Sequence, residues 1–178
     1  MVLSRRSAAA LGLTLLTALG CGAPAEPVSP VQGLPPYTPE EARLFDDVIA
    51  SELFDYGLSP RHAESDPLID DRAAFADTAT VMKVTTLSSE GSGTAYSLSL
   101  RPLGTISGPA ERETVTLSVS ASNPSFLLLD GMGGRWVGTE LVLLARRYRQ
   151  GEDAVIHFRA EPNRPAVLDV IARARRSK

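Results

Sequence analysis

Few side chains in this sequence have the chemistry of a catalytic base or nucleophile. The 178 residues include two histidines, His62 and His157, and one cysteine, Cys21. His157 lies in a stretch with a period of two, which predicts a strand with the imidazole on its outer face. No Gly-x-Ser-x-Gly motif supplies a nucleophile for that base. We therefore expect no enzyme and no catalytic residue, and a hydrolase that uses His157 is kept as an alternative.

Metal and cofactor chemistry is not expected either. One cysteine and two distant histidines do not provide the four ligands of a zinc site. The acidic residues from Glu64 to Asp77 lack the alternate spacing and turn glycine of a calcium loop. The glycine-rich stretch 131–134 is not followed by the Lys-Ser/Thr pair of a phosphate loop. We therefore expect no metal ligand and no cofactor.

Three residues are candidate contacts for a ligand or a protein partner. Trp136 is the only tryptophan, and an exposed indole at the end of a barrel offers a stacking surface. Tyr96 and Arg101 lie in one predicted strand. We hypothesise that these three line a binding cleft, and a core position of Trp136 remains the alternative interpretation.

Cys21 follows a short apolar segment at the N-terminus. Arg5 and Arg6 precede an uncharged run from Ala8 to Leu19, which is the layout of an export signal. The run is shorter than the roughly 20 apolar residues that span a membrane. The sequence therefore predicts a signal peptide over residues 1–20 that is removed after export.

The segment Ala18-Leu19-Gly20-Cys21 resembles the lipobox of bacterial lipoproteins. In that family the cysteine is alkylated by diacylglycerol and the signal is cut just before it. The resemblance implies lipidation at Cys21, and Gly22 in place of aspartate implies the outer membrane. An ordinary secretory signal, which would leave a soluble secreted or periplasmic protein, is the alternative.

The charge balance bears on the class of partner. Loss of residues 1–20 removes Arg5 and Arg6 and no acidic residue, so the net charge changes from −3 to −5. A nucleic-acid binder is expected to carry a basic surface. We therefore expect no nucleic-acid partner.

The mature chain divides into a tether and one domain. Residues 21–36 contain five prolines and few large apolar side chains, which predicts an extended, stiff tether. Residues 37–178 are expected to form a single globular domain that starts with a helical part, 38–76. Thr38-Pro39 is typical of a helix start, and apolar residues recur at helical spacing as far as Tyr56. A second, shorter helix is expected from Asp66-Pro67 to Phe75.

After this helical part, between residues 78 and 160, the sequence changes to a period of two. The five predicted strands are Thr80–Leu87, Tyr96–Arg101, Thr114–Val119, Glu140–Tyr148 and Val155–Ala160. A helical turn and a glycine-rich stretch, 125–138, separate the third strand from the fourth, and a last helix is expected over 165–176.

This order resembles OB-type small barrels, and residues 76–81 resemble the first barrel strand of netrin-like modules. The resemblance implies an α+β fold in which a small five-stranded OB-like β-barrel lies between an N-terminal helix and a C-terminal helix.

The function expected from these features is that of an accessory protein of the cell envelope. A lipid on Cys21 would attach the domain to the outer membrane, where it would act without catalysis on an envelope protein partner. The first alternative is a module that binds a small lipid, glycan or peptide near Trp136 and Tyr96. The second is the hydrolase that uses His157.

Overall fold

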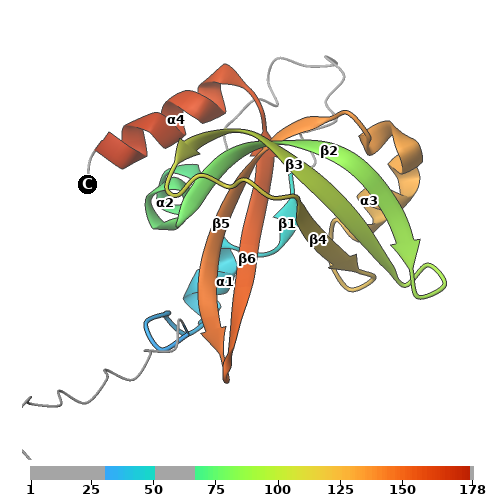
Figure 1. Ribbon diagram of the computed structural model, residues 1–178, viewed down its shortest axis with the longest axis horizontal. Coiled ribbons are helices and arrows are strands. Elements are labelled where there is room, and N and C mark those ends of the chain that lie inside the picture. Colours follow the sequence, from blue (N-terminus) through green and yellow to red (C-terminus); the bar gives the residue numbers. More distant parts are fainter. Residues whose placement is uncertain (1–30, 51–66, 177–178) are drawn as a thin grey trace, which may run out of the picture.

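One curled sheet of six strands forms the centre of the described chain (Figure 1). The computed structural model describes residues 31–50 and 67–176. The strands are β1 (Val48–Ile49), β2 (Thr78–Glu90), β3 (Ala95–Ser107), β4 (Val115–Ser120), β5 (Glu140–Gln150) and β6 (Asp153–Pro162). They lie in the order β1-β6-β5-β2-β3-β4, with β1 parallel to β6 and all other neighbours antiparallel.

Four α-helices and one 3-10 helix accompany the described sheet. They are α1 (Pro39–Leu44), α2 (Ile69–Phe75), α3 (Phe126–Met132), the 3-10 helix η3 (Gly133–Trp136) and α4 (Pro165–Arg176). The mixed α+β class, the helices at both ends, the insert between the third and fourth predicted strands and the C-terminal helix are confirmed. The five predicted strands are confirmed as β2 to β6, and each observed strand has at least as many residues as the predicted one.

The predicted N-terminal helix is wrong for residues 45–50. Helix α1 begins as expected, since the Thr38 side chain accepts a hydrogen bond from Glu41 N, but it ends at Leu44. Asp47 then adopts a left-handed φ of 58°, and residues 48–49 pair with β6 as β1. The apolar spacing of this segment fits a buried strand as well as a helix, and pairing with β6 decides between them. The rest of the predicted helix, through Tyr56, lies outside the described residues.

A closed five-stranded barrel is not confirmed. Strand β1 forms one edge of the sheet and β4 forms the other. The sheet curls into a half-barrel, and these two edge strands do not pair with each other (Figure 1). Side chains connect the two edges in place of a ladder of backbone hydrogen bonds. Asn123 Nδ2 donates to Asp47 O at 2.9 Å, and Ile49 N donates to Ser125 Oγ at 2.8 Å.

The two faces of the sheet bury different sets of side chains. On the concave face, inward residues of β2 to β6 pack with α3 and η3; this core includes Met82, Leu98, Leu129, Trp136 and Phe158. On the convex face, α1, α2 and α4 cover the alternate residues; this second core includes Phe45, Ala73, Leu144, Tyr148 and Ile171. Because side chains alternate along a strand, β2, β3 and β5 contribute residues to both cores.

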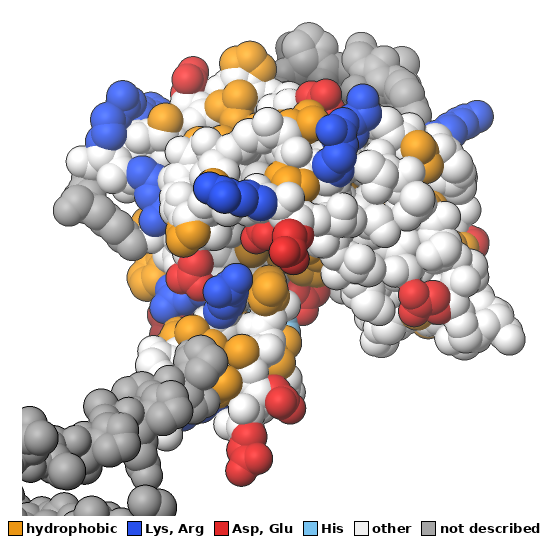
Figure 2. Space-filling view, in the orientation of Figure 1, with side chains coloured by type: hydrophobic (Ala, Val, Ile, Leu, Met, Phe, Trp, Pro, Cys, Tyr) orange, Lys and Arg blue, Asp and Glu red, His pale blue; other side chains and the backbone are white. Residues whose placement is uncertain are grey.

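Charged residues of both signs lie on the face of the molecule that Figure 2 shows. Figure 2 shows basic, acidic and apolar side chains interspersed on the face in view, without a continuous field of one sign. The last turn of α4 carries Arg173, Arg175 and Arg176, which favour the negative end of the helix dipole.

Candidate functional site

A cavity of about 900 Å³ opens between the concave side of the sheet, the end of α2 and the loop that joins β3 to β4. Its floor is formed by two neighbouring strands. Thr78, Thr80 and Met82 come from β2, and Leu143 and Ala145 come from β5. Thr80 pairs with Leu143 and Thr78 pairs with Ala145, so these alternate residues lie side by side on one face.

Two large apolar side chains stand at the rim of this cavity. Phe75, at the end of α2, and Ile156, on β6, are each 48% exposed. Leu34 joins them from the described end of the predicted tether. Residues 31–36 lie along β5, because Arg149 N donates to Pro35 O at 2.8 Å. The apolar rim thus combines the N-terminal segment with the sheet.

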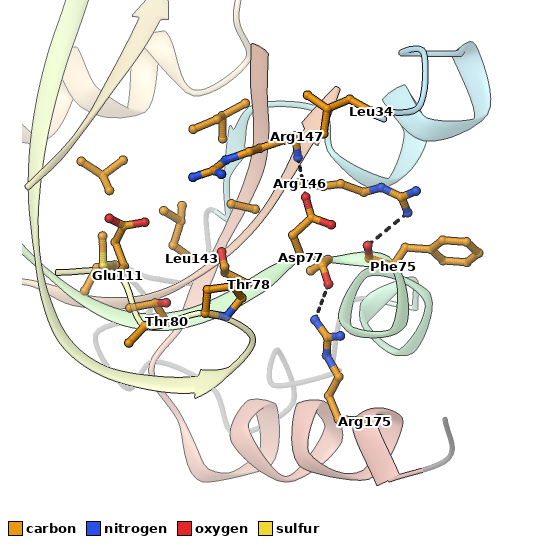
Figure 3. A pocket seen from close by; sticks show the side chains of 17 residues that line it. Leu34, Phe75, Asp77, Thr78, Thr80, Glu111, Leu143, Arg146, Arg147 and Arg175 are labelled. Carbon is orange, nitrogen blue, oxygen red and sulfur yellow. Dashed lines mark hydrogen bonds between the residues drawn. The ribbon is translucent and has the colours of Figure 1, made fainter. Parts of the chain in front are cut away.

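Asp77 fixes the place where β2 leaves β5. Its backbone N donates to Ala145 O at 2.9 Å, and its carboxylate Oδ2 accepts a hydrogen bond from Arg147 N at 2.8 Å. The Asp77 carboxylate therefore accepts the hydrogen bond from Arg147 N that a backbone carbonyl would accept if the β2–β5 pairing continued. Arg147 is therefore held by its backbone, while its side chain extends over the cavity (Figure 3).

The arginines that line the cavity differ in their contacts. Arg146 Nη1 donates to Phe75 O at 3.1 Å and Nη2 lies 3.7 Å from Glu41 Oε1. Arg175 Nη2 donates to Ala76 O. The guanidinium of Arg147 has no hydrogen bond or ion pair with any described residue. Figure 3 shows it on the same side as Glu111 and Thr80, whereas Arg146 points the other way, toward Phe75.

Thr80 carries an unsatisfied polar atom in the cavity floor. The residue is 2% exposed, and its Oγ1 has no hydrogen-bond partner in the part of the chain that the structure describes. Most buried side-chain polar atoms in folded proteins have a partner. The floor therefore combines apolar side chains with two threonines, and the enclosed hydroxyl of Thr80 is left unpaired.

His157 lies on the opposite, convex face. Its Nδ1 is 2.6 Å from Asp47 Oδ2, and its ring stacks on Tyr37 with centroids 3.6 Å apart and planes within 6°. No serine or threonine hydroxyl in residues 31–50 and 67–176 forms a hydrogen bond with this imidazole. The contacts orient His157 between the segment before β1 and β6, and they supply no nucleophile from these residues.

Two tyrosines beside His157 hold their protons strongly. Burial, together with Asp47, Asp46 and Glu41, raises the pKa of Tyr37 to about 12. Burial also raises the pKa of Tyr148, and the hydrogen bond from its hydroxyl to Glu41 Oε2 at 2.8 Å acts in the same direction. Both phenols are therefore neutral hydrogen-bond donors at neutral pH.

A buried charge cluster connects α2 with the edge of the sheet. Arg72 and Glu161 are each 3% exposed, and Arg72 Nη1 lies 3.8 Å from Glu161 Oε1. Arg72 Nε donates to Leu44 O at 2.7 Å, and Arg159 Nε donates to Glu161 Oε1 at 2.9 Å. Burial and the nearby Arg159 lower the pKa of Arg72. Because the side chains of Arg72 and Glu161 are enclosed, neither is accessible to a substrate.

The three predicted binding residues lie apart from the cavity. Trp136 is 0% exposed and packs in the concave core. Tyr96 donates its hydroxyl to Asp130 Oδ1 at 2.6 Å, and its ring centroid is 5.2 Å from that of Phe126. Arg101 is an exposed residue of β3. None of them lines the cavity, and Cys21 and His62 lie outside the described residues.

The cavity residues gave a weak signal in the sequence. The run from Glu140 to Tyr148 is apolar on both faces, so the alternation that separates Leu143 and Ala145 from their neighbours is hidden. Thr78 and Thr80 do alternate with Ala79 and Val81. That alternation predicts a polar face at the start of the first predicted strand, and it is the feature of the sequence that could have indicated the cavity.

Residues 31–50 and 67–176 contain neither a metal-binding group nor a membrane-spanning helix. No three or more His, Cys, Asp or Glu side chains gather closely enough to hold a metal ion. None of the helices there combines the length and apolar character needed to cross a bilayer. No protein-family model matches the chain, and no curated protein or solved structure is significantly similar to it.

Proposed function

We propose that this chain is a non-catalytic module of the cell envelope that holds a small ligand in the half-barrel cavity. The observation that carries the proposal is a largely apolar floor beside polar groups that have no partner among the described residues, notably the Thr80 hydroxyl and the Arg147 guanidinium. Ligand sites are typically cavities of about 300–1,000 Å³ with apolar walls and a few polar groups. The cavity of about 900 Å³ falls within this range.

Energetics supports the same proposal. A buried hydroxyl without a partner costs the folded state about 1–3 kcal/mol. A ligand atom that accepts or donates a hydrogen bond at Thr80 recovers this cost on binding. The exposed rim residues Phe75 and Ile156 gain in addition, because a ligand removes their apolar surface from water.

The place of action remains the one expected from the N-terminus. We propose lipidation of Cys21 and attachment to the outer membrane. The 14 residues from Cys21 to Leu34 span at most about 45 Å when extended, so the cavity rim would lie within that distance of the bilayer. The mass of the mature protein tests this proposal. A wild-type mass that includes acyl chains, absent from Cys21→Ser, is expected; a chain that starts at Glu26 or with an unmodified thiol contradicts it.

The fold itself fits a modified OB barrel, which we propose as its origin. Strands β2 to β6 keep the order β6-β5-β2-β3-β4, and α3 lies between β4 and β5. This is the arrangement of a five-stranded barrel that has opened between its third and fifth strands, with β1 occupying the edge beside β6. The proposal carries no function with it, because unrelated functions share such barrels.

A docking role toward an envelope protein is the second candidate function. Leu127 of α3 is 78% exposed and Val137, just after η3, is 52% exposed, which gives this end of the molecule an apolar surface. Crosslinking in intact cells should recover one specific protein from wild type and not from Leu127→Asp. The hydrolase alternative fails if His157→Ala leaves every detectable activity and phenotype unchanged.

Ligand binding is tested with N-phenylnaphthylamine, a neutral dye whose emission rises in apolar sites. Wild type should enhance its emission saturably. Val115→Phe and Ala145→Leu extend side chains into the cavity from two walls and should weaken binding about tenfold, the effect of losing roughly 1.4 kcal/mol. Val137→Phe adds the same ring as Val115→Phe at an exposed site outside the cavity and should change nothing.

The dye experiment is read together with thermal unfolding of each variant. A cavity variant that unfolds within a few degrees of wild type is a valid test. The proposal is overturned if wild type shows no saturable enhancement, or if both folded cavity variants bind the dye as wild type does.

A further inference from the structure

We propose that the ligand is a single-chain anionic amphiphile with a second, uncharged polar group on its chain. Its carboxylate or phosphate head binds Arg147, and the polar group on the chain meets Thr80. This inference rests on the proposed ligand-binding function and specifies the chemistry of that same cavity.

Arg147 is the group that selects an anionic head. Arg146 and Arg175 already donate to the carbonyls of Phe75 and Ala76, so neither is available in full. Arg147 keeps its whole guanidinium unpaired among the described residues and extends it over the cavity (Figure 3). A guanidinium fork matches the two oxygens of a carboxylate or phosphate better than any neutral group.

The distance between the two polar groups calls for a chain rather than a compact anion. Thr80 pairs with Leu143, which precedes Arg147 on β5 by four residues. Along an antiparallel strand this separation is about 13 Å. The floor between them presents Leu143 and Ala145, with Ile156 beside Arg147 on β6. An apolar chain covers these side chains, whereas free phosphate or acetate would leave them in water.

Thr80 gives the chain its second polar group. Its hydroxyl is enclosed and unpaired, and an apolar methylene placed against it would leave that cost in place. A hydroxyl or carbonyl on the ligand at this depth forms the missing hydrogen bond. The cavity should therefore prefer a hydroxylated chain over a plain hydrocarbon chain.

Glu111 allows the effect of cavity charge on ligand affinity to be tested in both directions. This half-buried carboxylate also lines the cavity and has no hydrogen bond or ion pair with a described residue. It repels an anionic head at Arg147. Removal of its charge should strengthen binding of an anionic amphiphile, and removal of the Arg147 charge should weaken it.

Displacement of bound N-phenylnaphthylamine by four amphiphiles tests the proposal. Dodecanoate and dodecyl phosphate carry an anionic head, dodecanol carries a neutral one, and ω-hydroxydodecanoate adds a terminal hydroxyl to the acid. Wild type should bind both anionic compounds about tenfold more tightly than dodecanol, as expected for charge-assisted hydrogen bonds. ω-Hydroxydodecanoate should bind more tightly than dodecanoate.

Variants assign these preferences to residues. Arg147→Gln should remove the preference for dodecanoate over dodecanol, and Glu111→Gln should increase it. Thr80→Val should remove the advantage of ω-hydroxydodecanoate over dodecanoate. Arg101→Gln removes the same charge as Arg147→Gln from an exposed part of β3 outside the cavity and should leave all four affinities unchanged.

The outcomes separate this inference from the function on which it rests. If the dye binds but dodecanol competes as well as dodecanoate, the anionic head is excluded while ligand binding stands. If ω-hydroxydodecanoate has no advantage, or keeps it in Thr80→Val, the second polar group is excluded. Absence of dye binding to wild type overturns the proposed function, and this inference falls with it.

Discussion

Asp47 holds His157 and Phe158 at once, through both oxygens of one carboxylate. Oδ2 lies 2.6 Å from His157 Nδ1, and Oδ1 accepts a hydrogen bond from Phe158 N at 2.9 Å. The backbone N of Asp47 donates to Phe158 O, also at 2.9 Å. A residue with a left-handed φ of 58° thus makes three bonds to β6 just before β1 begins.

Substitution of Asp47 should destabilise the fold in a graded way. Asp47→Asn keeps one acceptor oxygen and a residue that tolerates the left-handed conformation, so a loss of about 1 kcal/mol is expected. Asp47→Ala removes both acceptors and adds backbone strain, for a loss of about 2–4 kcal/mol. Urea unfolding measures both. Equal losses in the two variants would contradict the graded effect, and two losses near zero would mean that the carboxylate contacts contribute nothing.

Alkaline pH should destabilise the protein through its buried phenols. The pKa of Tyr37 rises from 10.0 to about 12 on folding, so between these values the unfolded chain has lost a proton that the folded chain retains. The free energy of unfolding therefore falls as pH increases through this window, and the stabilisation is fully present below pH 10.

Variants identify the tyrosines responsible. Tyr37→Phe and Tyr148→Phe should each make the decline between pH 10 and pH 12 less steep, whatever they do to stability at neutral pH. Urea titrations at several pH values give the slopes. Slopes identical to wild type in both variants would refute this explanation.

Arg72 should be the most sensitive charged residue outside the cavity. Arg72→Met removes one of the two arginines beside the enclosed Glu161, which keeps its hydrogen bond from Arg159, so we expect a loss below the roughly 3–5 kcal/mol of a fully broken buried ion pair. The double variant Arg72→Met/Glu161→Gln should be less destabilised than the sum of the two single variants. Chemical denaturation of all four proteins gives the coupling free energy, and simple additivity would contradict the pairing.

Gly108 should not tolerate a side chain. It has a φ of +83°, and an added Cβ would lie 2.1 Å from Asp77 O. Gly108→Ala should therefore cost more than about 2 kcal/mol and loosen the loop that borders the cavity. Gly104→Ala is the matched control, since nothing lies within 4 Å of its added Cβ. It should be neutral or gain up to about 1 kcal/mol. Equal stability of the two variants would be inconsistent with the close approach.

The strands were predictable where only one face of the sequence is apolar. Tyr96, Leu98 and Leu100 alternate with serines, and β3 follows that alternation. Helix α4 was predictable because its apolar stripe and basic last turn agree. Strand β1 was not predictable, because its two apolar residues fit the buried face of a helix as well as that of a strand.

The open barrel and its cavity depend on contacts that the sequence does not encode locally. Ser125 and Asn123 form hydrogen bonds with Ile49 and Asp47 across 76 positions, and these bonds connect the two edges of the sheet. Trp136 lies in the concave core, where it packs with inward residues of the sheet and with α3. The cavity lies on the same concave side but is not lined by Trp136, and the β2–β5 register places Thr80 opposite Leu143, four residues before Arg147.

Beyond Ala145, β5 has no neighbouring strand from β2, and an exposed strand edge is a template for aggregation. Asp77 and Pro35 take up the amide protons of Arg147 and Arg149 that face outward there. The N-terminal segment therefore acts as a shield against fibril growth as well as a connection. A chain shortened to begin after Pro36 would expose Arg149 N and should precipitate more readily on storage than the longer protein.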